Sequence, residues 1–440
     1  MTDKPANNIS RRKFIQSSAQ FGAAAGVLGT MGVPRARAAG KTELTFWTFL
    51  NPKSKGGRSR AQAEMIAAFE KKNPNIKVNI EIAPWQTVDR QLIQAVNAGR
   101  GPDVALLYSG RLGQHVEAGS ILPLEPYVSS WSAAQKDDWI VPWDSLVWNN
   151  KKMAFFADNR VMIMVYRADW LEQAGLKSPP KTWIEAAQTA AKFTKPPQQW
   201  GYITALSQSQ NAAGLEEFFV PMLLGMGGQL LGPNNEPYFN SMAGQACMSY
   251  LADLVHRYKV TPENCVSLSF NKQQDGIEAG NYGMAVFGSH RITTIQNSGP
   301  AGKHIRTAPV PSPDPDHPSP AIAAGQTFAI AKTSKNPDAA WKFIDHMISA
   351  DMELVNAKLG GQLPPRKSAY GSDWFKSPNA HAGQLLSWKD YIVKAGIPYK
   401  FPIRFAEVSR LLAKSAEQVV GQGLHPADAL QQAAQEWRNS

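Results

Sequence analysis

The sequence is poor in cysteine. Cys247 and Cys265 are the only two among 440 residues, and two thiols are too few for a cysteine-rich zinc or iron–sulfur site. Two alternatives remain open for them. They form one disulfide in an oxidising compartment, or they stay as two buried free thiols.

The short motifs that mark common enzyme classes are also missing. The chain contains no His-Glu-x-x-His zinc motif, no Gly-x-Ser-x-Gly elbow and no glycine-rich phosphate motif, and its eight histidines are scattered. We therefore assign no catalytic residue and expect neither a metal site nor a cofactor. Binding without chemistry is the simplest function that these absences leave. Carboxylate pairs such as those of glycosidases escape this search, because their spacing is set in three dimensions.

Long apolar runs are missing as well. The stretch that comes closest to such a run lies near the N-terminus. Ser10–Ile15 (SRRKFI) matches the twin-arginine export signal, a weakly apolar stretch follows over Phe21–Val33, and Ala36-Arg37-Ala38 supplies small residues for cleavage. The apolar stretch is shorter than the roughly 20 residues that a membrane span needs. We expect residues 1–38 to be a signal peptide, handled by the twin-arginine export machinery. The mature chain would then begin near Ala39 in the periplasm.

Acidic residues are not in excess either. The excess of basic residues is modest in the mature chain. The net charge is +11, and residues 1–38 contribute +5 of it, which leaves +6 spread along the sequence. A nucleic-acid surface needs clustered basic residues, so we expect no nucleic-acid partner. Hydrophobic residues make up 43% and charged residues 18%, which is typical of a globular protein with a large core. We expect a monomer.

The first part of the mature chain alternates between strand and helix patterns. This alternation predicts an α/β fold whose first sheet is parallel. The expected strands are 43–47, 76–82 and 104–108, and the expected helices are 59–72 and 87–98.

The stretch 152–194 is the most informative in the chain. Val161–Tyr166 has the β-branched and aromatic content of a strand, and the helix pattern after it ends at Gly175. Thr182 and Glu185 have the spacing of a capping box for the next helix.

The run Tyr166–Glu185 (YRADWLEQAGLKSPPKTWIE) resembles a signature of bacterial extracellular solute-binding proteins, family 1, which serve as sugar receptors of ABC importers. Further resembling segments are 101–125, 276–290 and 323–349. The resemblance implies a periplasmic-binding-protein-like fold of the maltose-binding type (type II). In this fold two α/β lobes are joined by a hinge of two or three crossing segments, and the ligand lies between the lobes.

The resemblance also implies the domain boundaries and the partners. We expect an N-terminal lobe of residues 39–157 plus 308–355 and a C-terminal lobe of residues 158–307 plus 356–440. The expected partners are a sugar-like ligand and the permease subunits of an ABC transporter. The alternative is an exported carbohydrate-active enzyme, a lyase or hydrolase, for which His290 and Asp158 are the candidate acid and base.

Candidate ligand-binding residues follow from strand ends and from the resembling segments. Aromatic faces suit the C–H-rich face of a pyranose, a glycine permits close backbone approach, and a glutamine side chain both donates and accepts hydrogen bonds. The candidates are Trp47, Trp85, Tyr108, Arg160, Ser289, His290, Gly325, Gln326 and Arg366.

The chain departs from the maltose-binding pattern at two places. Arg160 stands where those relatives have an acidic residue, and Ser289-His290-Arg291 stands where they have an aromatic one. Arg366 falls in a turn that meets the cleft by resemblance. A guanidinium pairs with a carboxylate or phosphate through two hydrogen bonds, so an anionic ligand such as a uronate or a sugar or glycerol phosphate is one alternative. In the other alternative Arg160 and Arg366 pair with acids of the opposite lobe or face solvent. A neutral mono- or oligosaccharide is the default ligand.

Overall fold

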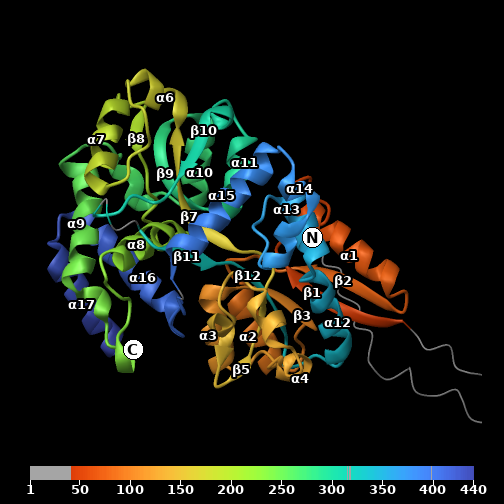
Figure 1. Ribbon diagram of the computed structural model, residues 1–440. Helices are drawn as coiled ribbons and strands as arrows, with labels where there is room; N and C mark the ends of the chain where they lie inside the picture. The colour runs from red at the N-terminus through yellow and green to blue at the C-terminus, as the bar shows by residue number, and fades with distance from the viewer. Residues whose placement is uncertain (1–40, 315, 317–318, 398) are drawn as a thin grey trace, which may run out of the picture. The chain divides into compact units, whose positions relative to one another are not determined.

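The computed structural model of the chain describes residues 41–314, 316, 319–397 and 399–440, so the export signal expected in residues 1–38 lies outside the described residues. The described residues contain two large β-sheets (Figure 1), each with its own hydrophobic core, and a third sheet of two short strands. We call the five-stranded sheet and its core the first lobe, and the six-stranded sheet and its core the second lobe. No helix among the described residues is long and apolar enough to cross a membrane.

The sheet of the first lobe has the strand order β2-β1-β3-β12-β6. Strand β1 is parallel to β2 and β3, which confirms the predicted parallel arrangement. Strand β12 runs antiparallel to β3 and β6, so a late segment of the chain completes the sheet. The bounds are β1 Thr42–Thr48, β2 Ile76–Ile82, β3 Val104–Tyr108, β6 Phe155–Phe156 and β12 Gln326–Ile330.

Helices pack on this sheet through aromatic side chains. Phe343 contacts Phe46 of β1 and Phe69 of α1, with ring centroids 5.3 and 5.2 Å apart, and such edge contacts add to the energy of apolar burial. Helix α13 packs against α1. The elements in these parts of the chain are α1 Gly57–Lys72, α2 Val88–Asn97, α3 Leu112–Glu117, α4 Glu125–Val128, α5 Ala133–Asp137, β4 Val147–Trp148, β5 Lys151–Lys152, α12 Pro337–Met347 and α13 Ala350–Gly360.

The sheet of the second lobe has the order β13-β11-β7-β9-β8, and β10 also pairs with β7. Strand β7 is at its centre and is buried along almost its whole length, which explains its continuous apolar sequence. The strand β11 was not predicted, because it is four residues long and its pairing with β7 is visible only in three dimensions. The bounds are β7 Arg160–Arg167, β8 Trp200–Tyr202, β9 Tyr282–Gly288, β10 Ile305–Ala308, β11 Ala321–Ala324 and β13 Gly396–Ile397.

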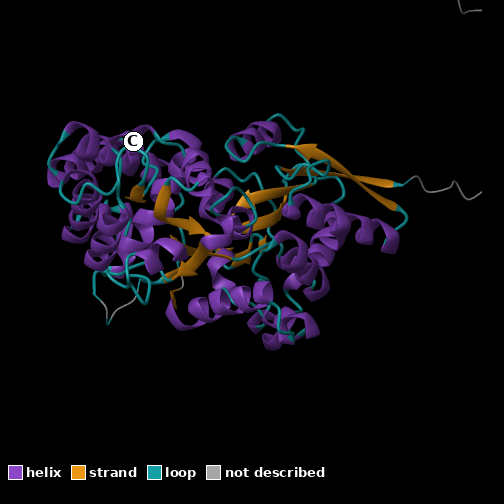
Figure 2. Cartoon of the chain, turned by 90° about the horizontal axis from the view of Figure 1, so that it is seen from above, coloured by secondary structure: helices purple, strands orange, loops and turns teal. Residues whose placement is uncertain are grey.

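The helices of the second lobe begin where the sequence predicts them. The capping box of α7 is present, with the Thr182 hydroxyl accepting from the Glu185 backbone N–H at 3.2 Å. Gly175 has a φ of +70°, as expected after α6. Figure 2 shows helices on both sides of the strands. The bounds are α6 Ala168–Gln173, α7 Trp183–Phe193, α8 Ala213–Gly225, α9 Met242–His256, α10 Phe270–Ala279, α11 Ile292–Gln296, α14 Asp373–Lys376, α15 Ala380–Ala395, α16 Phe405–Ala416 and α17 Pro426–Arg438.

Of the two alternatives for the cysteines, the structure has the second. Cys247 and Cys265 are buried free thiols. Burial in apolar surroundings raises the pKa of the Cys247 thiol far above its usual range and that of Cys265 to about 12, so both are protonated and unreactive at neutral pH.

The chain passes between the two large sheets three times. It leaves β6 and enters β7 through residues 157–159, returns from β11 to β12 at Gly325, and passes back after β12 to β13. In this third passage the Leu363 carbonyl accepts from the Asn159 backbone N–H of the first at 2.9 Å. The first two crossings touch, because a Cβ atom at Gly325 would lie 1.9 Å from the Asp158 carbonyl oxygen. Ser109 holds the second crossing at the end of β3: its backbone N–H donates to the Gly325 carbonyl at 2.9 Å, and its hydroxyl accepts from the Gly325 N–H at 3.2 Å. Gly325 is therefore required for close packing of the hinge.

Candidate ligand-binding cleft

Elements of both lobes line a cavity of about 370 Å³. This volume is near the lower end of the range for small-molecule sites in proteins, roughly 300–1,000 Å³. The lining combines aromatic rings with charged side chains, a composition suited to a ligand that has both apolar faces and polar groups. The lining residues are Phe49, Leu50, Arg58, Trp85, Val88, Asp89, Tyr108, Arg111, Arg160, Met162, Ala213, Glu216, Glu217, Phe270, Gln274, His290, Arg291, Thr294 and Gln326.

Five of the nine candidate residues line this cavity: Trp85, Tyr108, Arg160, His290 and Gln326. Their backbones meet there because they lie at the ends of strands. Trp85 follows β2 and Tyr108 ends β3, at the carboxyl edge of the parallel strands, where ligands bind in open α/β sheets. Gln326 begins β12, which is antiparallel to β3, so its first residue lies opposite Tyr108.

Two further candidates, Ser289 and Gly325, lie next to the cavity without lining it. The Ser289 hydroxyl is buried and accepts a hydrogen bond from the Val161 backbone N–H at 3.3 Å. Gly325 packs against the Asp158 backbone in the hinge. Both residues position their neighbours His290 and Gln326.

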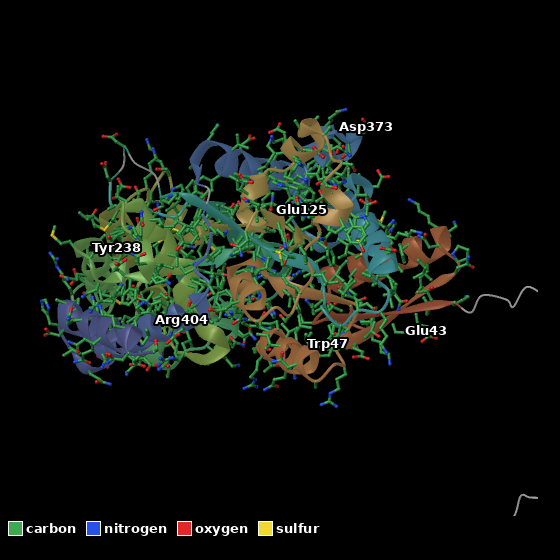
Figure 3. All side chains as sticks on the ribbon, turned by 90° about the horizontal axis from the view of Figure 1, so that it is seen from below. Glu43, Trp47, Glu125, Tyr238, Asp373 and Arg404 are labelled. Atoms are coloured by element: carbon green, nitrogen blue, oxygen red, sulfur yellow. The ribbon has the colours of Figure 1, made fainter. Side chains whose placement is uncertain are left out.

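Trp47 lies away from the cavity. Side chains alternate along β1, and Phe46 and Thr48 point into the core while Trp47 lies on the opposite, partly exposed side. Its indole N–H donates to the Glu81 carboxylate at 2.7 Å, at an exposed position. Figure 3 labels Trp47 on the first lobe.

Arg366 also lies away from the cavity. Its guanidinium is 4.5 Å from the centroid of the Trp139 ring, pairs with Asp138 at 3.3 Å and donates to the Ile348 carbonyl at 2.7 Å. Its backbone N–H donates to the buried Glu353 carboxylate. The Arg366 side chain is therefore paired within the protein. This agrees with the alternative in which the arginines pair with acids of the protein.

One group of cavity residues is basic, and we call it the arginine end: Arg58, Arg160, His290 and Arg291. The carboxylate of Asp158, buried in the first crossing, anchors part of it. This carboxylate accepts from Arg160 Nε at 3.1 Å and from the Gln326 backbone N–H at 3.0 Å, and it lies 3.5 Å from the Arg58 guanidinium. With its amide oriented to satisfy both its neighbours, Gln326 also accepts from Arg160 at 2.9 Å.

Arg291 and His290 project from the segment after β9. The Arg291 guanidinium stacks over the Phe270 ring at 4.0 Å and donates to the Asn271 side chain at 3.0 Å, while its Nε has no hydrogen-bond partner among the described residues. Burial and the neighbouring arginines lower the pKa of His290 well below its usual value, so the ring is neutral at pH 7. Its Nδ1 atom is buried and likewise has no hydrogen-bond partner within the described part of the chain.

The other charged group is acidic, and we call it the acid end: Asp89, Arg111, Glu216 and Glu217. Arg111 lies 3.6 Å from both Asp89 of the first lobe and Glu216 of α8 in the second, so this ion pair joins the lobes. The Asp89 carboxylate also forms a hydrogen bond with His115 Nε2 at 3.0 Å. Burial raises the pKa of Glu216, and the Arg111 charge opposes that shift.

Glu217 is next to Glu216 on α8 and lies closer to the arginine end. Its carboxylate accepts a hydrogen bond from the Gly288 backbone N–H, at the end of β9. Burial raises the pKa of Glu217 to about 7, although Arg291 and the Gly288 N–H favour the charged form. Glu217 therefore changes its charge near neutral pH.

The Tyr108 ring connects the two ends. Its centroid is 6.0 Å from the Arg111 guanidinium and 5.9 Å from that of Arg160. Burial raises the pKa of its hydroxyl far above the usual value, so the phenol stays protonated and can donate a hydrogen bond.

Six charged residues of the cavity were not among the candidates: Arg58, Asp89, Arg111, Glu216, Glu217 and Arg291. A signal existed for two of them, because Glu216 and Glu217 are the only charged residues in the otherwise apolar helix α8, and acids in a buried helix need a partner or a ligand. Arg111 also follows the end of β3 closely. Arg58 carried no such signal.

The described residues contain no cluster of three or more His, Cys, Asp or Glu side chains that could hold a metal ion. The candidate acid and base of the enzymatic alternative both lie at the arginine end. Asp158 is held by Arg160 and the Gln326 N–H there, as described above.

Comparison with known families decides the class of protein. The profile described as bacterial extracellular solute-binding protein matches residues 52–353, well over half of the sequence. The chain belongs to this family. The resemblance seen in the sequence is thereby confirmed, and members of this family bind solutes rather than transform them.

Two relatives of this solute-binding protein each share less than a quarter of their aligned residues with it. A diacetylchitobiose-binding protein of Streptomyces coelicolor, DasA, is 23% identical over 322 residues, which cover 70% of this chain and 70% of the relative. A binding protein of Brucella abortus is 22% identical over 319 residues, covering 71% and 74%.

Solved structures show the fold. The maltose-bound structure of MalE3 from T. maritima superposes with a TM-score of 0.76 at 21% identity, covering 90% of this chain and 99% of the other. A solute-binding protein of Agrobacterium radiobacter in complex with ribitol has a TM-score of 0.74 at 18% identity, covering 90% and 98%. The two-lobed, maltose-binding type of periplasmic-binding-protein fold is therefore confirmed.

Proposed function

We propose that this protein is the substrate-binding component of an ABC importer and that it binds a sugar or sugar-derived solute in the cavity between its lobes. The twin-arginine pathway would deliver it to the periplasm as a monomer, where it would hand its ligand to the membrane permease. The observation that carries the proposal is the cavity itself: aromatic rings and paired charges from both lobes surround one compact space.

The chemistry of the lining suits a polyhydroxylated compound. The rings of Trp85, Tyr108 and Phe270 offer apolar faces for C–H groups. Carboxylates accept and guanidiniums donate hydrogen bonds, so adjacent hydroxyl groups of one ring find both kinds of partner. Relatives named for diacetylchitobiose and for arabinooligosaccharides support the same class of ligand.

The hinge suits binding by closure. The two crossings at 157–159 and Gly325 lie side by side, so rotation about them needs little repacking of either core. Closure would place Arg111 of the first lobe against Glu216 of the second. A ligand drives this equilibrium only through its greater affinity for the closed form.

The experiment is a thermal-shift and calorimetric screen of the mature chain, from about Ala39, against mono- and disaccharides, polyols, uronates and sugar phosphates. A ligand at 100 times its Kd adds roughly 2.7 kcal/mol of stability, which is readily measured. Trp85→Ala should abolish binding, whereas Trp47→Phe, outside the cavity, should not.

Two results would overturn the proposal. If Trp85→Ala and Trp47→Phe both bind as well as the unmodified protein does, the cavity is not the site. If the recovered compound is chemically changed, the protein is an enzyme and not a receptor.

A further inference from the structure

The arginine end gathers more positive charge than its surroundings neutralise. Arg58, Arg160 and Arg291 lie close enough for their charges to repel, and with burial this lowers the pKa of both Arg58 and Arg291 to about 10. Asp158 is the carboxylate paired with Arg58 and Arg160. Arg291 contacts the neutral side chains of Asn271 and Gln274 and a phenylalanine ring.

Glu217 compensates these arginines only in part. It is near Arg291 and Arg160, but it is partly protonated near neutral pH, and its carboxylate already accepts from the Gly288 N–H. Glu278 and Asp275 also favour the charge of Arg291, but less than Glu217 does. Among the described residues, Asp158 is the carboxylate that forms ion pairs with these guanidiniums. His290 adds no charge, yet its buried Nδ1 and the Nε of Arg291 have no hydrogen-bond partner among the described residues.

The acid end carries the opposite excess of charge in the same cavity. There Arg111 has Asp89 on one side and Glu216 on the other, both at 3.6 Å. Cations are outnumbered by acids at that end and outnumber them at the arginine end. The cavity is therefore polarised along its length.

We propose that the arginine end binds an anionic group of the ligand, a carboxylate or a phosphate, and that the acid end binds hydroxyl groups of the same molecule. This inference deepens the proposed function and rests on it: the solute is an acidic sugar derivative of compact size, such as a hexuronate or a sugar or glycerol phosphate. Guanidiniums match both anions through paired, charge-assisted hydrogen bonds.

The same placement makes closure depend on the anion. Arg58 is on α1 of the first lobe, whereas Arg291 follows β9 of the second. Closing the cleft brings these like charges together in a buried site, where their repulsion is screened little by solvent. An anion bound between the two guanidiniums attracts both of them and offsets their repulsion. An anionic ligand therefore favours the closed form more than a neutral ligand does.

The test compares matched pairs of probes on the mature protein by calorimetry: glucuronate against glucose, galacturonate against galactose, and glycerol 3-phosphate against glycerol. The variants are Arg291→Gln and Arg58→Gln. The control is Arg410→Gln, which removes the same charge from an exposed pair with Glu436. Small-angle X-ray scattering with and without each probe reports closure.

We expect an anionic probe to bind at least about tenfold more tightly than its neutral partner, since hydrogen bonds between charged groups are stronger than those to a neutral group. Arg291→Gln and Arg58→Gln should each remove most of that preference, because each should weaken binding of the anionic probe by a larger factor than binding of its neutral partner. Arg410→Gln should change neither. The carboxylate and phosphate pairs then identify which anion the site prefers.

Three results would count against these proposals in distinguishable ways. Equal affinity for charged and neutral partners in the unmodified protein overturns the anion site and leaves solute binding intact. An anion preference that survives in both arginine variants overturns the assigned residues. Failure of every probe and every sugar of the wider screen to bind overturns the proposed function itself. If a variant does not fold, the matched probes on the unmodified protein still decide the first question.

Discussion

The arginine end and the acid end lie in one cavity and share the Tyr108 ring, yet they differ in how their charges are paired. At the acid end Arg111 pairs with both Asp89 and Glu216, and the Glu217 carboxylate accepts from the Gly288 backbone N–H. At the arginine end one carboxylate, Asp158, is paired with two guanidiniums, and a third, that of Arg291, has no ion-pair partner among the described residues.

This difference separates structure from recognition. A buried ion pair that is complete joins elements together, and breaking it costs stability. A buried cation without its counter-ion is costly in the free protein, and that cost is recovered only when something else supplies the charge. The acid end thus joins the lobes, and the arginine end selects the ligand.

Removing Asp158 should have the largest effect on stability. Asp158→Asn leaves the guanidiniums of Arg58 and Arg160 without their shared carboxylate in a buried hinge, and we expect a loss of about 3–5 kcal/mol in the free energy of unfolding by urea. The control, Asp253→Asn, breaks an exposed pair with Arg257 and should cost about 1 kcal/mol or less. If Asp158→Asn lowers the unfolding free energy by no more than the control does, the charges of the arginine end are compensated without the Asp158 carboxylate.

Glu217 should make stability depend on pH. Its folded-state pKa of about 7 is above the usual value of 4.5, so the folded protein holds a proton that the unfolded chain releases. The resulting stability is fully present below pH 4.5 and is lost as the pH rises through 7, by up to about 3 kcal/mol in total.

The measurement for Glu217 is the unfolding free energy of the unmodified protein minus that of Glu217→Gln, at several pH values from 4.5 to 8. The difference isolates Glu217, because the other titrating groups are present in both proteins. It should fall as the pH rises. A flat difference would show that Glu217 is ionised throughout and that the arginine end is better compensated than we infer.

Glu216→Gln tests the acid end. The change leaves Arg111 with Asp89 alone and removes the charge that links the lobes, and we expect a loss of about 1–3 kcal/mol at pH 7. Glu217→Gln is the matched control on the same helix and should cost less, because Glu217 is partly protonated at that pH. If the two substitutions lower the unfolding free energy equally, Glu216 and Glu217 do not account for the difference in charge pairing between the two ends.

The fold could be predicted from the sequence far better than the site. Strand β2 and strand β3 were predicted to the residue, and the capping box of Thr182 and Glu185 is present, because these features depend on neighbours along the chain. The short strand β11 was missed, since its pairing is with a distant segment.

The cavity depends on which residues meet across the lobes, and the sequence holds little information on that. Tyr108 and Gln326 were placed correctly beside the cavity because strand ends could be counted. Arg366 was grouped with Arg160 because both arginines lie near motifs that resemble the family. In the structure, however, Arg366 forms an ion pair with Asp138. Arg58 and Arg291, which do lie beside Arg160, were not among the candidates.

The smallest effect should come from Trp47, which ends a strand as Tyr108 does but lies outside both ends of the cavity. Trp47→Phe removes an exposed hydrogen bond to Glu81 and keeps an aromatic ring on the strand. We expect the unfolding free energy to change by about 0.5 kcal/mol or less, and the Kd for any solute that binds to stay the same within about twofold. Tyr108→Phe is the matched substitution inside the cavity, and it removes the hydroxyl from the ring that lies near both the Arg111 and the Arg160 guanidinium. If Trp47→Phe weakens binding as much as Tyr108→Phe does, the ligand reaches beyond the cavity onto the outer side of β1. The two charged ends would then describe only part of the site.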